Sequence, residues 1–164
     1  MNSRHKIVQL DALRGIVGAA RAGGRTIVLA NGIFDLLHVG HVRYLEAAKR
    51  EGEVLVVGIN SDASARRLKG PGRPILNEQA RAELVAALGA VDHVVIFPER
   101  NVESLLDAIR PDVHAKGTDY TAETVPERET AARLGTRVAI VGDPKRHSTS
   151  DLFSRIRRAD GART

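Results

Sequence analysis

An α/β fold with a doubly wound parallel sheet is predicted from two patterns in the sequence. Short, continuous apolar runs rich in β-branched residues recur at residues 26–30, 54–59, 93–97, 113–115 and 138–141. Continuous rather than alternating runs are typical of strands buried on both faces, as in parallel sheets. Segments with helical apolar spacing lie between these runs, and the alternation predicts helices on both faces of one sheet with right-handed crossovers.

The helices can be assigned in chain order. The pattern over residues 6–22 predicts an N-terminal helix packed outside the sheet, which ends at Gly23-Gly24 before the first strand. Apolar residues three or four positions apart predict further helices at residues 42–50, 77–88, 102–109, 126–134 and 150–158. Asn77 suits an N-cap, while Pro126 suits a first turn and Gly135 a helix end. Residues 68–76, rich in glycine and proline, are expected to be irregular.

The bulk composition fits one globular domain of 164 residues, with 43% hydrophobic and 27% charged residues. The absence of cysteine excludes disulfides and thiol catalysis and fits a reducing compartment. Residues 1–10 lack the apolar centre of a signal peptide, and no stretch reaches the length of a transmembrane helix. We therefore expect a cytoplasmic protein with no membrane partner.

The net charge of +5 comes from a chain with 20 arginines and five lysines. Nucleic-acid binding is one explanation, but three Phe and two Tyr leave little surface for base stacking. We favour an anion site lined by some cations, and a last helix whose terminal turns hold others against its dipole, namely Arg155, Arg157 and Arg158. No nucleic-acid partner is expected.

Residues 31–41 form the most informative segment, because they connect the first buried strand to a helix. Ligands bind at such junctions in open parallel sheets, and the free N–H groups of a helix N-terminus favour phosphate. His38 and His41 flank Gly40 there and can contact a phosphate whose charge is changing. Zinc is the competing ligand for paired histidines, but it takes three or four protein ligands and the other histidines are scattered. We expect no protein-held metal.

Three further segments follow a strand or open a helix, so all four are expected to meet at the carboxyl edge of the sheet. They are Asn60-Ser61-Asp62 with Arg66, Arg67 and Lys69; Lys116-Gly117-Thr118-Asp119-Tyr120; and His147-Ser148-Thr149-Ser150. Together they supply the cations and hydroxyls that a triphosphate requires. Simpler interpretations stay open: a solvated face for the arginines, a turn for Asp62, and helix caps for Asp35 and the Ser-Thr-Ser segment. Neither Gly-x-Gly-x-x-Gly nor a Walker A motif is present.

The segment from Asn31 to His41, with its His-x-Gly-His motif, resembles the cytidylyltransferase-like nucleotidyltransferases. Three further motifs are similar to the branch that makes ADP-heptose from heptose 1-phosphate and ATP: Asn60-Ser-Asp62, Arg67-Leu-Lys-Gly70 with Arg73-Pro74, and Lys116-Gly-Thr-Asp-Tyr120. Thr118 departs from that branch, which usually carries a second glycine there. The resemblance implies a Rossmann-like sheet, a nucleotidyltransferase domain at residues 26–159, an N-terminal extension at 1–25 and a frayed tail at 160–164.

The resemblance also implies ATP and a sugar 1-phosphate as substrates, Mg²⁺ bound mainly through the ATP phosphates, and a homo-oligomer, either a dimer or a tetramer. Catalysis is expected from His38, His41, Lys69 and Lys116. Nucleotide contacts are expected from Asn31, Gly32, Ile33, Phe34, Gly40, His41, Lys116, Asp119, His147, Ser148 and Thr149. Sugar-phosphate contacts are expected from Asp35, Asn60, Asp62, Arg67, Lys69 and Arg73. The alternatives are a cytidylyltransferase for glycerol phosphate or another polyol phosphate, and a nucleotide sensor or RNA-binding module without catalysis.

Overall fold

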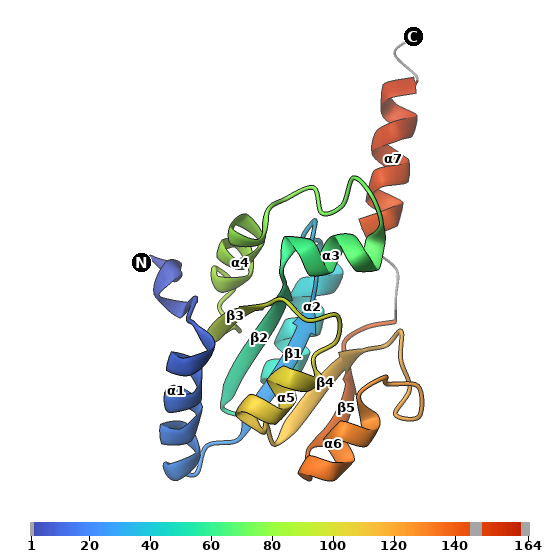
Figure 1. Ribbon diagram of the computed structural model, residues 1–164. Coiled ribbons are helices and arrows are strands. Elements are labelled where there is room, and N and C mark those ends of the chain that lie inside the picture. The colour runs from blue at the N-terminus through green and yellow to red at the C-terminus, as the bar shows by residue number, and fades with distance from the viewer. Residues whose placement is uncertain (1, 145–148, 162–164) are drawn as a thin grey trace.

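Five parallel strands in the order β3-β2-β1-β4-β5 form the centre of the computed structural model, which describes residues 2–144 and 149–161 (Figure 1). The strands are β1 (Ile27–Gly32), β2 (Val54–Asn60), β3 (His93–Phe97), β4 (Val113–Gly117) and β5 (Arg137–Val141). Every predicted strand is present, and all the pairings are parallel. The predicted fold class, a Rossmann-like doubly wound sheet, is confirmed.

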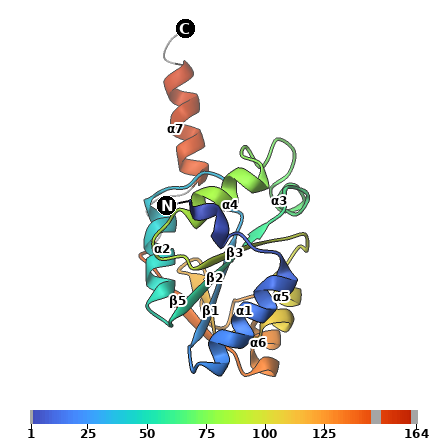
Figure 2. The same cartoon turned by 90° about the vertical axis from the view of Figure 1, so that its left-hand side faces the viewer.

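Helices cover both faces of the sheet. Figure 2 shows α1 (Leu10–Ala22), α5 (Glu103–Ile109) and α6 (Arg128–Leu134) on one side, and α2 (Val39–Lys49) with α4 (Glu78–Ala86) on the other. Ile27 and Leu29 of β1 pack in the core beneath α1 and α5, whereas Val28 and Ala30 pack in the core beneath α2 and α4. Because successive strand residues point to opposite faces, one continuous apolar run builds both cores.

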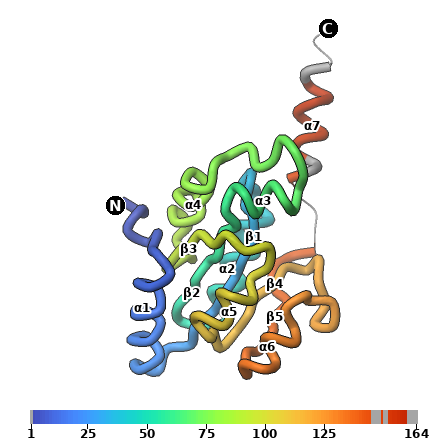
Figure 3. Tube along the Cα trace, viewed as in Figure 1, coloured from blue at the N-terminus to red at the C-terminus, as the bar shows by residue number. Residues whose placement is uncertain are grey.

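Two elements lie at the carboxyl end of the strands. The tube in Figure 3 shows α3 (Asp62–Lys69) lying across that end and α7 (Thr149–Gly161) extending away from the body. The α7 helix runs through Gly161, and residues 162–164 of the predicted tail lie outside the described ranges. Among the helices of the described ranges, none has both the length and the apolar composition needed to cross a membrane.

The N-terminal helix differs from the prediction. Residues 3–6 form a short 3₁₀ helix, η1 (Ser3–Lys6), and α1 starts at Leu10 rather than at residue 6. Between them Ile7 forms a parallel bridge with Val94, and the N–H of Val8 donates to the carbonyl of Val94 over 2.9 Å. Helical periodicity continued through these residues in the sequence, but pairing with the edge strand β3 extends the backbone there.

Helix ends follow the predicted caps in two cases. The side chain of Asn77 accepts a hydrogen bond from the N–H of Ala80 and starts α4, and Gly135 ends α6 with φ of 72°. Pro126 was expected in the first turn of α6, but the helix starts two residues later, at Arg128. The α3 helix was not predicted at all, although Ser61 caps it through a bond from the N–H of Ser64.

The strand order reverses between β1 and β4, which are neighbours in the sheet. From β1 the chain proceeds outward to β2 and β3 on one side, and from β4 to β5 on the other. The loops after β1 and β4 therefore diverge and leave a crevice between them at the carboxyl edge, where open α/β sheets bind ligands.

Candidate active site

A cavity of about 720 Å³ occupies this crevice, and its size suits a nucleotide. Most of the predicted site residues line it, although they come from five different segments: Asn31, Gly32, Ile33, Phe34, Asp35, His38, Gly40, His41, Asn60, Lys69, Arg73, Lys116, Asp119 and Thr149. His147 and Ser148 lie outside the described residues. Asp62 and Arg67 are not part of the lining.

The two histidines lie face to face at the start of α2. Their ring centroids are 3.9 Å apart with an interplanar angle of 22°, so the rings stack. His38 is the N-cap residue, and its Nδ1 accepts a hydrogen bond from the N–H of Gly40 over 3.1 Å. Because Nδ1 acts as an acceptor, the proton of the neutral His38 ring is on Nε2, which is then available to donate.

His41 is buried against the loop that precedes it. The ring of Phe34 meets it edge-on at a centroid distance of 5.1 Å, and Phe34 itself has φ of 51°. Burial, and next the neighbouring His38, lower the pKa of His41 to about 4. Among the described residues, none hydrogen-bonds to Nδ1 of His41. His41 is therefore neutral at physiological pH, and an anion beside it would be the group that raises its pKa.

Lys116 brings a cation to the opposite wall of the cavity, at the end of β4. Its Nζ lies 3.4 Å from Oδ1 of Asn31 and 3.5 Å from Oε2 of Glu127. The same Asn31 oxygen is 3.2 Å from Nε2 of His114. Burial, and then the charge of Lys116, lower the pKa of His114 to about 3, so His114 is neutral and Nε2 donates to Asn31. A polar chain thus joins β1 to β4 below the cavity.

The arrangement matches a known family. Residues 29–159 fit the family model described as Cytidylyltransferase-like. The chain belongs to the cytidylyltransferase-like family. This membership places it among the nucleotidyltransferases, as the His-x-Gly-His motif predicts.

Similar proteins support this assignment of the cytidylyltransferase-like chain. The bifunctional protein HldE of Syntrophotalea carbinolica is 48% identical over 151 residues, 92% of this chain and 31% of that protein. The bifunctional protein HldE of Geobacter metallireducens is 48% identical over 160 residues, 98% of this chain and 33% of that protein. The chain therefore spans about a third of the length of these curated relatives.

A solved structure shares the architecture of this cytidylyltransferase-like chain. The crystal structure of the lipopolysaccharide core biosynthesis protein from Thermoplasma volcanium GSS1 aligns with a TM-score of 0.64 and 28% identity. It covers 74% of this chain and 100% of that chain.

Asp35 holds the rim of the cavity together. Its carboxylate accepts from the N–H groups of Ile75 and Leu76 and from Nε of Arg73, at 2.8, 3.2 and 2.7 Å. The interpretation of Asp35 as a helix cap is therefore wrong, because His38 caps α2 and Asp35 fastens the loop of residues 70–77 instead. Arg73 also lies over the ring of Phe153 of α7, with Cζ 4.4 Å from the centroid.

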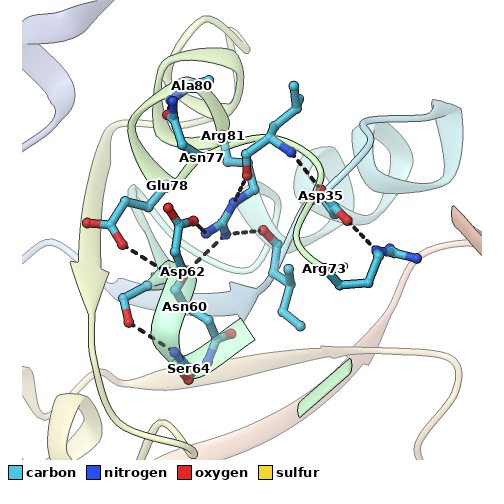
Figure 4. A network of polar contacts seen from close by, with 12 residues as sticks. Asp35, Asn60, Asp62, Ser64, Arg73, Asn77, Glu78, Ala80 and Arg81 are labelled. Atoms are coloured by element: carbon cyan, nitrogen blue, oxygen red, sulfur yellow. Dashed lines mark hydrogen bonds and ion pairs between the residues drawn. The ribbon is translucent and has the colours of Figure 1, made fainter. Parts of the chain in front are cut away.

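Arg81 of α4 was missed by the sequence analysis, yet it connects three of the site loops. Its fully buried guanidinium donates to the carbonyls of Leu76, Ile33 and Asn60 and to Oδ1 of Asp62, at distances of 2.7–3.0 Å. Figure 4 shows this guanidinium at the centre of the network, with Asp35 and Arg73 beside it. In sequence Arg81 is one polar residue of an amphipathic helix, and no local pattern distinguishes it.

The two predicted sugar-phosphate residues outside the lining have structural partners. Asp62 pairs with Arg81 at 2.8 Å, and its N–H donates to Oε2 of Glu78. Arg67 donates to the carbonyl of Pro98 over 2.6 Å. Both side chains thus connect α3 to its surroundings. Asn60 and Lys69, the other two residues of this segment, line the cavity.

The segment after β5 is held over the cavity by two side chains. Oγ1 of Thr118 donates to the carbonyl of Asp143 over 2.8 Å, and the carboxylate of Asp143 pairs with Arg43 of α2 at 3.0 Å. These bonds position the chain just before residues 145–148, which lie outside the described residues. Thr149, at the start of α7, lines the cavity.

A metal held by the protein would need a cluster of ligands. Within residues 2–144 and 149–161 there is no group of three or more His or acidic side chains with metal-binding geometry. Phosphate oxygens and water are the ligands that Mg²⁺ prefers when a nucleotide is present.

Proposed function

We propose that the chain transfers the adenylyl group of ATP to a sugar 1-phosphate, with heptose 1-phosphate as the acceptor that its motifs favour. The observation that carries the proposal is the meeting of His38, His41, Lys116 and Thr149 around one cavity at the sheet edge. The curated relatives named bifunctional protein HldE support it, since they match over nearly the whole of this chain.

The reaction is a direct displacement. An oxygen of the acceptor phosphate attacks the α-phosphorus of ATP, the bond from that phosphorus to the α–β bridging oxygen breaks, and pyrophosphate leaves. The acceptor phosphate is already an anion at neutral pH, so no strong base is needed. The work of the protein is to align two polyanions and to stabilise the charge that moves onto the leaving group.

The stacked histidines contact the α-phosphate in this proposal. His38 donates from Nε2, because its Nδ1 is occupied by the N–H of Gly40. His41 is neutral before substrate arrives and gains a hydrogen bond, or a proton, as negative charge develops beside it. The backbone of Asn31 to Phe34 lies close to the nucleotide, with Gly32 leaving room for the approach.

Cations on both walls hold the remaining phosphates. Lys116 and Lys69 neutralise the triphosphate and the departing pyrophosphate, and Thr149 contacts the outer phosphates near the N-terminus of α7. Arg73, which Asp35 orients, takes the acceptor phosphate together with Asn60. Asp119 contributes to the nucleotide side of the cavity. Asp62 and Arg67 support these loops from outside the cavity.

Mg²⁺ is proposed to arrive with ATP. The described residues provide no ligand cluster for a resident ion, so the phosphates and water would hold it. When bound, it supplies charge neutralisation on the triphosphate. The residues above provide the alignment.

The test is a pyrophosphate-release assay that crosses ATP, CTP, GTP and UTP with heptose 1-phosphate, hexose 1-phosphates and glycerol 3-phosphate. Adenylyl transfer predicts release with ATP and heptose 1-phosphate and little release with either alone. Release with CTP and glycerol phosphate would assign the chain to polyol-phosphate cytidylyl transfer. ATP binding without release in any combination would indicate a sensor.

We also propose that the protein acts in the cytoplasm as a homo-oligomer, a dimer or a tetramer. Light scattering on the purified chain tests the assembly. A mass equal to one chain at micromolar concentration would contradict it.

A further inference from the structure

The environment of Lys116 includes one residue that no catalytic role above explains. Glu127 is 4% exposed and lies just before α6, in a segment without a recognised motif. A carboxylate in such a position is rarely buried without a charged or hydrogen-bonded partner. Its side chain makes no capping bond to α6, so the helix end does not account for its burial. Its partner is Lys116, whose side chain is 8% exposed.

The contacts around the Lys116 ammonium are all long. Nζ lies 3.5 Å from Oε2 of Glu127, 3.4 Å from Oδ1 of Asn31 and 4.8 Å from the centroid of the Tyr120 ring. Charge-assisted bonds of this kind are shortest at about 2.7–2.9 Å. The ammonium is therefore surrounded by weak partners while it lines the cavity, and a phosphate oxygen could make a shorter contact than any of them.

We propose that Glu127 is a positioning residue that keeps Lys116 protonated and directed into the cavity, so that the cation is ready for the phosphates. This inference rests on the adenylyl transfer proposed above. Glu127 acts through Lys116 in it.

The charges around Lys116 favour this role for Glu127. Burial lowers the pKa of Lys116 below its ordinary value, whereas Glu127 raises it through its charge and its hydrogen bond. The other titratable groups facing Lys116 are His114 of β4, neutral through burial, and the phenols of Tyr120 and of Tyr44 on α2. Neither a neutral imidazole nor a neutral phenol supplies a negative charge. Glu127 is therefore the group among them that offsets the cost of burying the ammonium.

The direction of the effect follows from these signs. Removing the charge of Glu127 leaves the lowering by burial unopposed, so the pKa of Lys116 falls further. The cation would then be lost at a lower pH, and the alkaline limb of the activity profile would move the same way. A residue that only stabilises the fold would change neither limb.

The experiment uses Glu127→Gln, which keeps the size of the side chain and removes its charge. The matched control is Glu129→Gln, since the Glu129 side chain lies two positions away, is 87% exposed and pairs with Arg128. The readout is the ¹³Cε signal of labelled lysine in the free protein, followed with pH. Five lysines keep this spectrum simple, and Lys116→Arg assigns the signal.

We expect the Lys116 midpoint in Glu127→Gln to move to lower pH by about one unit or more, the range for opposite charges within 4–6 Å. Glu129→Gln should leave it unchanged. Should Glu127→Gln fail to fold, Glu127→Asp, which keeps the charge one methylene further back, should give a smaller shift in the same direction. An unchanged Lys116 midpoint in the folded variant would overturn the proposal.

The activity arm separates this inference from the proposed function. If the wild type releases pyrophosphate, the alkaline limb of Glu127→Gln should move with the NMR midpoint, and a limb that stays in place would contradict the role of Glu127 in catalysis. If the wild type releases none with any substrate pair, adenylyl transfer fails, while the NMR shift still decides whether Glu127 controls Lys116.

Discussion

Nη1 of Arg81 donates to the carbonyl of Ile33 over 2.7 Å, and so α4 holds the loop that carries the catalytic histidines. The same nitrogen donates to the carbonyl of Asn60, at the end of β2. Two loops of the cavity thus depend on one buried side chain from a helix that faces away from the nucleotide (Figure 4).

Replacing Arg81 with methionine is expected to destabilise the protein strongly. The change leaves Asp62 and three backbone carbonyls without their donor, and breaking a buried charged pair costs about 3–5 kcal/mol. Urea unfolding measures the loss. Arg4→Met is the matched control, because Arg4 pairs with Glu83 on the exposed side of α4 and such pairs contribute about 0–1 kcal/mol. Equal losses in the two variants would refute the role of Arg81.

Replacing His41 with alanine is expected to lower turnover by about 10²–10³-fold, the usual effect of removing a donor that stabilises a transition state. Far-UV circular dichroism should show an unchanged fold. His5→Ala serves as the control, since the imidazole of His5 is exposed and bonds the carbonyl of Asn2. Turnover close to that of the wild type, or a variant that does not fold, would contradict the assignment.

Gly32→Ala tests how closely the backbone of the first loop is fitted. A Cβ there would lie 3.0 Å from Cε2 and 3.2 Å from Cζ of Phe34, the ring that packs edge-on against His41. Displacing that ring moves the imidazole, and we expect turnover to fall by about tenfold to a hundredfold. A steady-state assay of pyrophosphate release measures the change.

Gly18→Ala provides the contrast. A Cβ at Gly18 meets no atom within 4 Å, and the residue is in the middle of α1. Alanine there should raise the unfolding free energy by about 0.5–1 kcal/mol and leave turnover unchanged. Equal turnover in the two alanine variants would show that the first loop tolerates bulk.

Stability is expected to fall as the pH drops from about 6.5 towards 4. His41 and His114 have pKa values of about 4 and about 3 in the folded protein, against 6.5 when unfolded. The unfolded chain therefore binds more protons in this window, and each extra proton costs about 1.4 kcal/mol per pH unit. This contribution is complete above pH 6.5. Urea unfolding of the wild type and of His41→Gln at pH 7, 6 and 5 should show a shallower slope for the variant. Parallel slopes would contradict the neutral state of His41.

The sheet could be predicted from sequence because its information is local. The runs at residues 93–97 and 54–59 are apolar throughout, and a strand buried on both faces leaves that signature in any context. The α3 helix carries no such signature, since it is rich in charged residues and packs only Ser64 and Ala65 inward. Its existence depends on the cap at Ser61.

The site was predictable where residues follow strands and unpredictable where they act from elsewhere. His38, Lys116 and Thr149 are placed by topology, because parallel strands end at one edge. Arg81 and Glu127 owe their roles to carbonyls and charges brought from distant segments. Asp35 was recognised as important, but its partners Arg73, Ile75 and Leu76 come from a loop whose path no sequence period determines.

Phosphorus-31 NMR of ATP and heptose 1-phosphate with the protein tests most directly which bond breaks in the cavity. Attack on the α-phosphorus predicts that ATP signals decay as pyrophosphate and a sugar-linked diphosphate appear in equal amounts. The appearance of ADP with orthophosphate, or ATP signals that persist in the presence of both substrates, would contradict adenylyl transfer at this site.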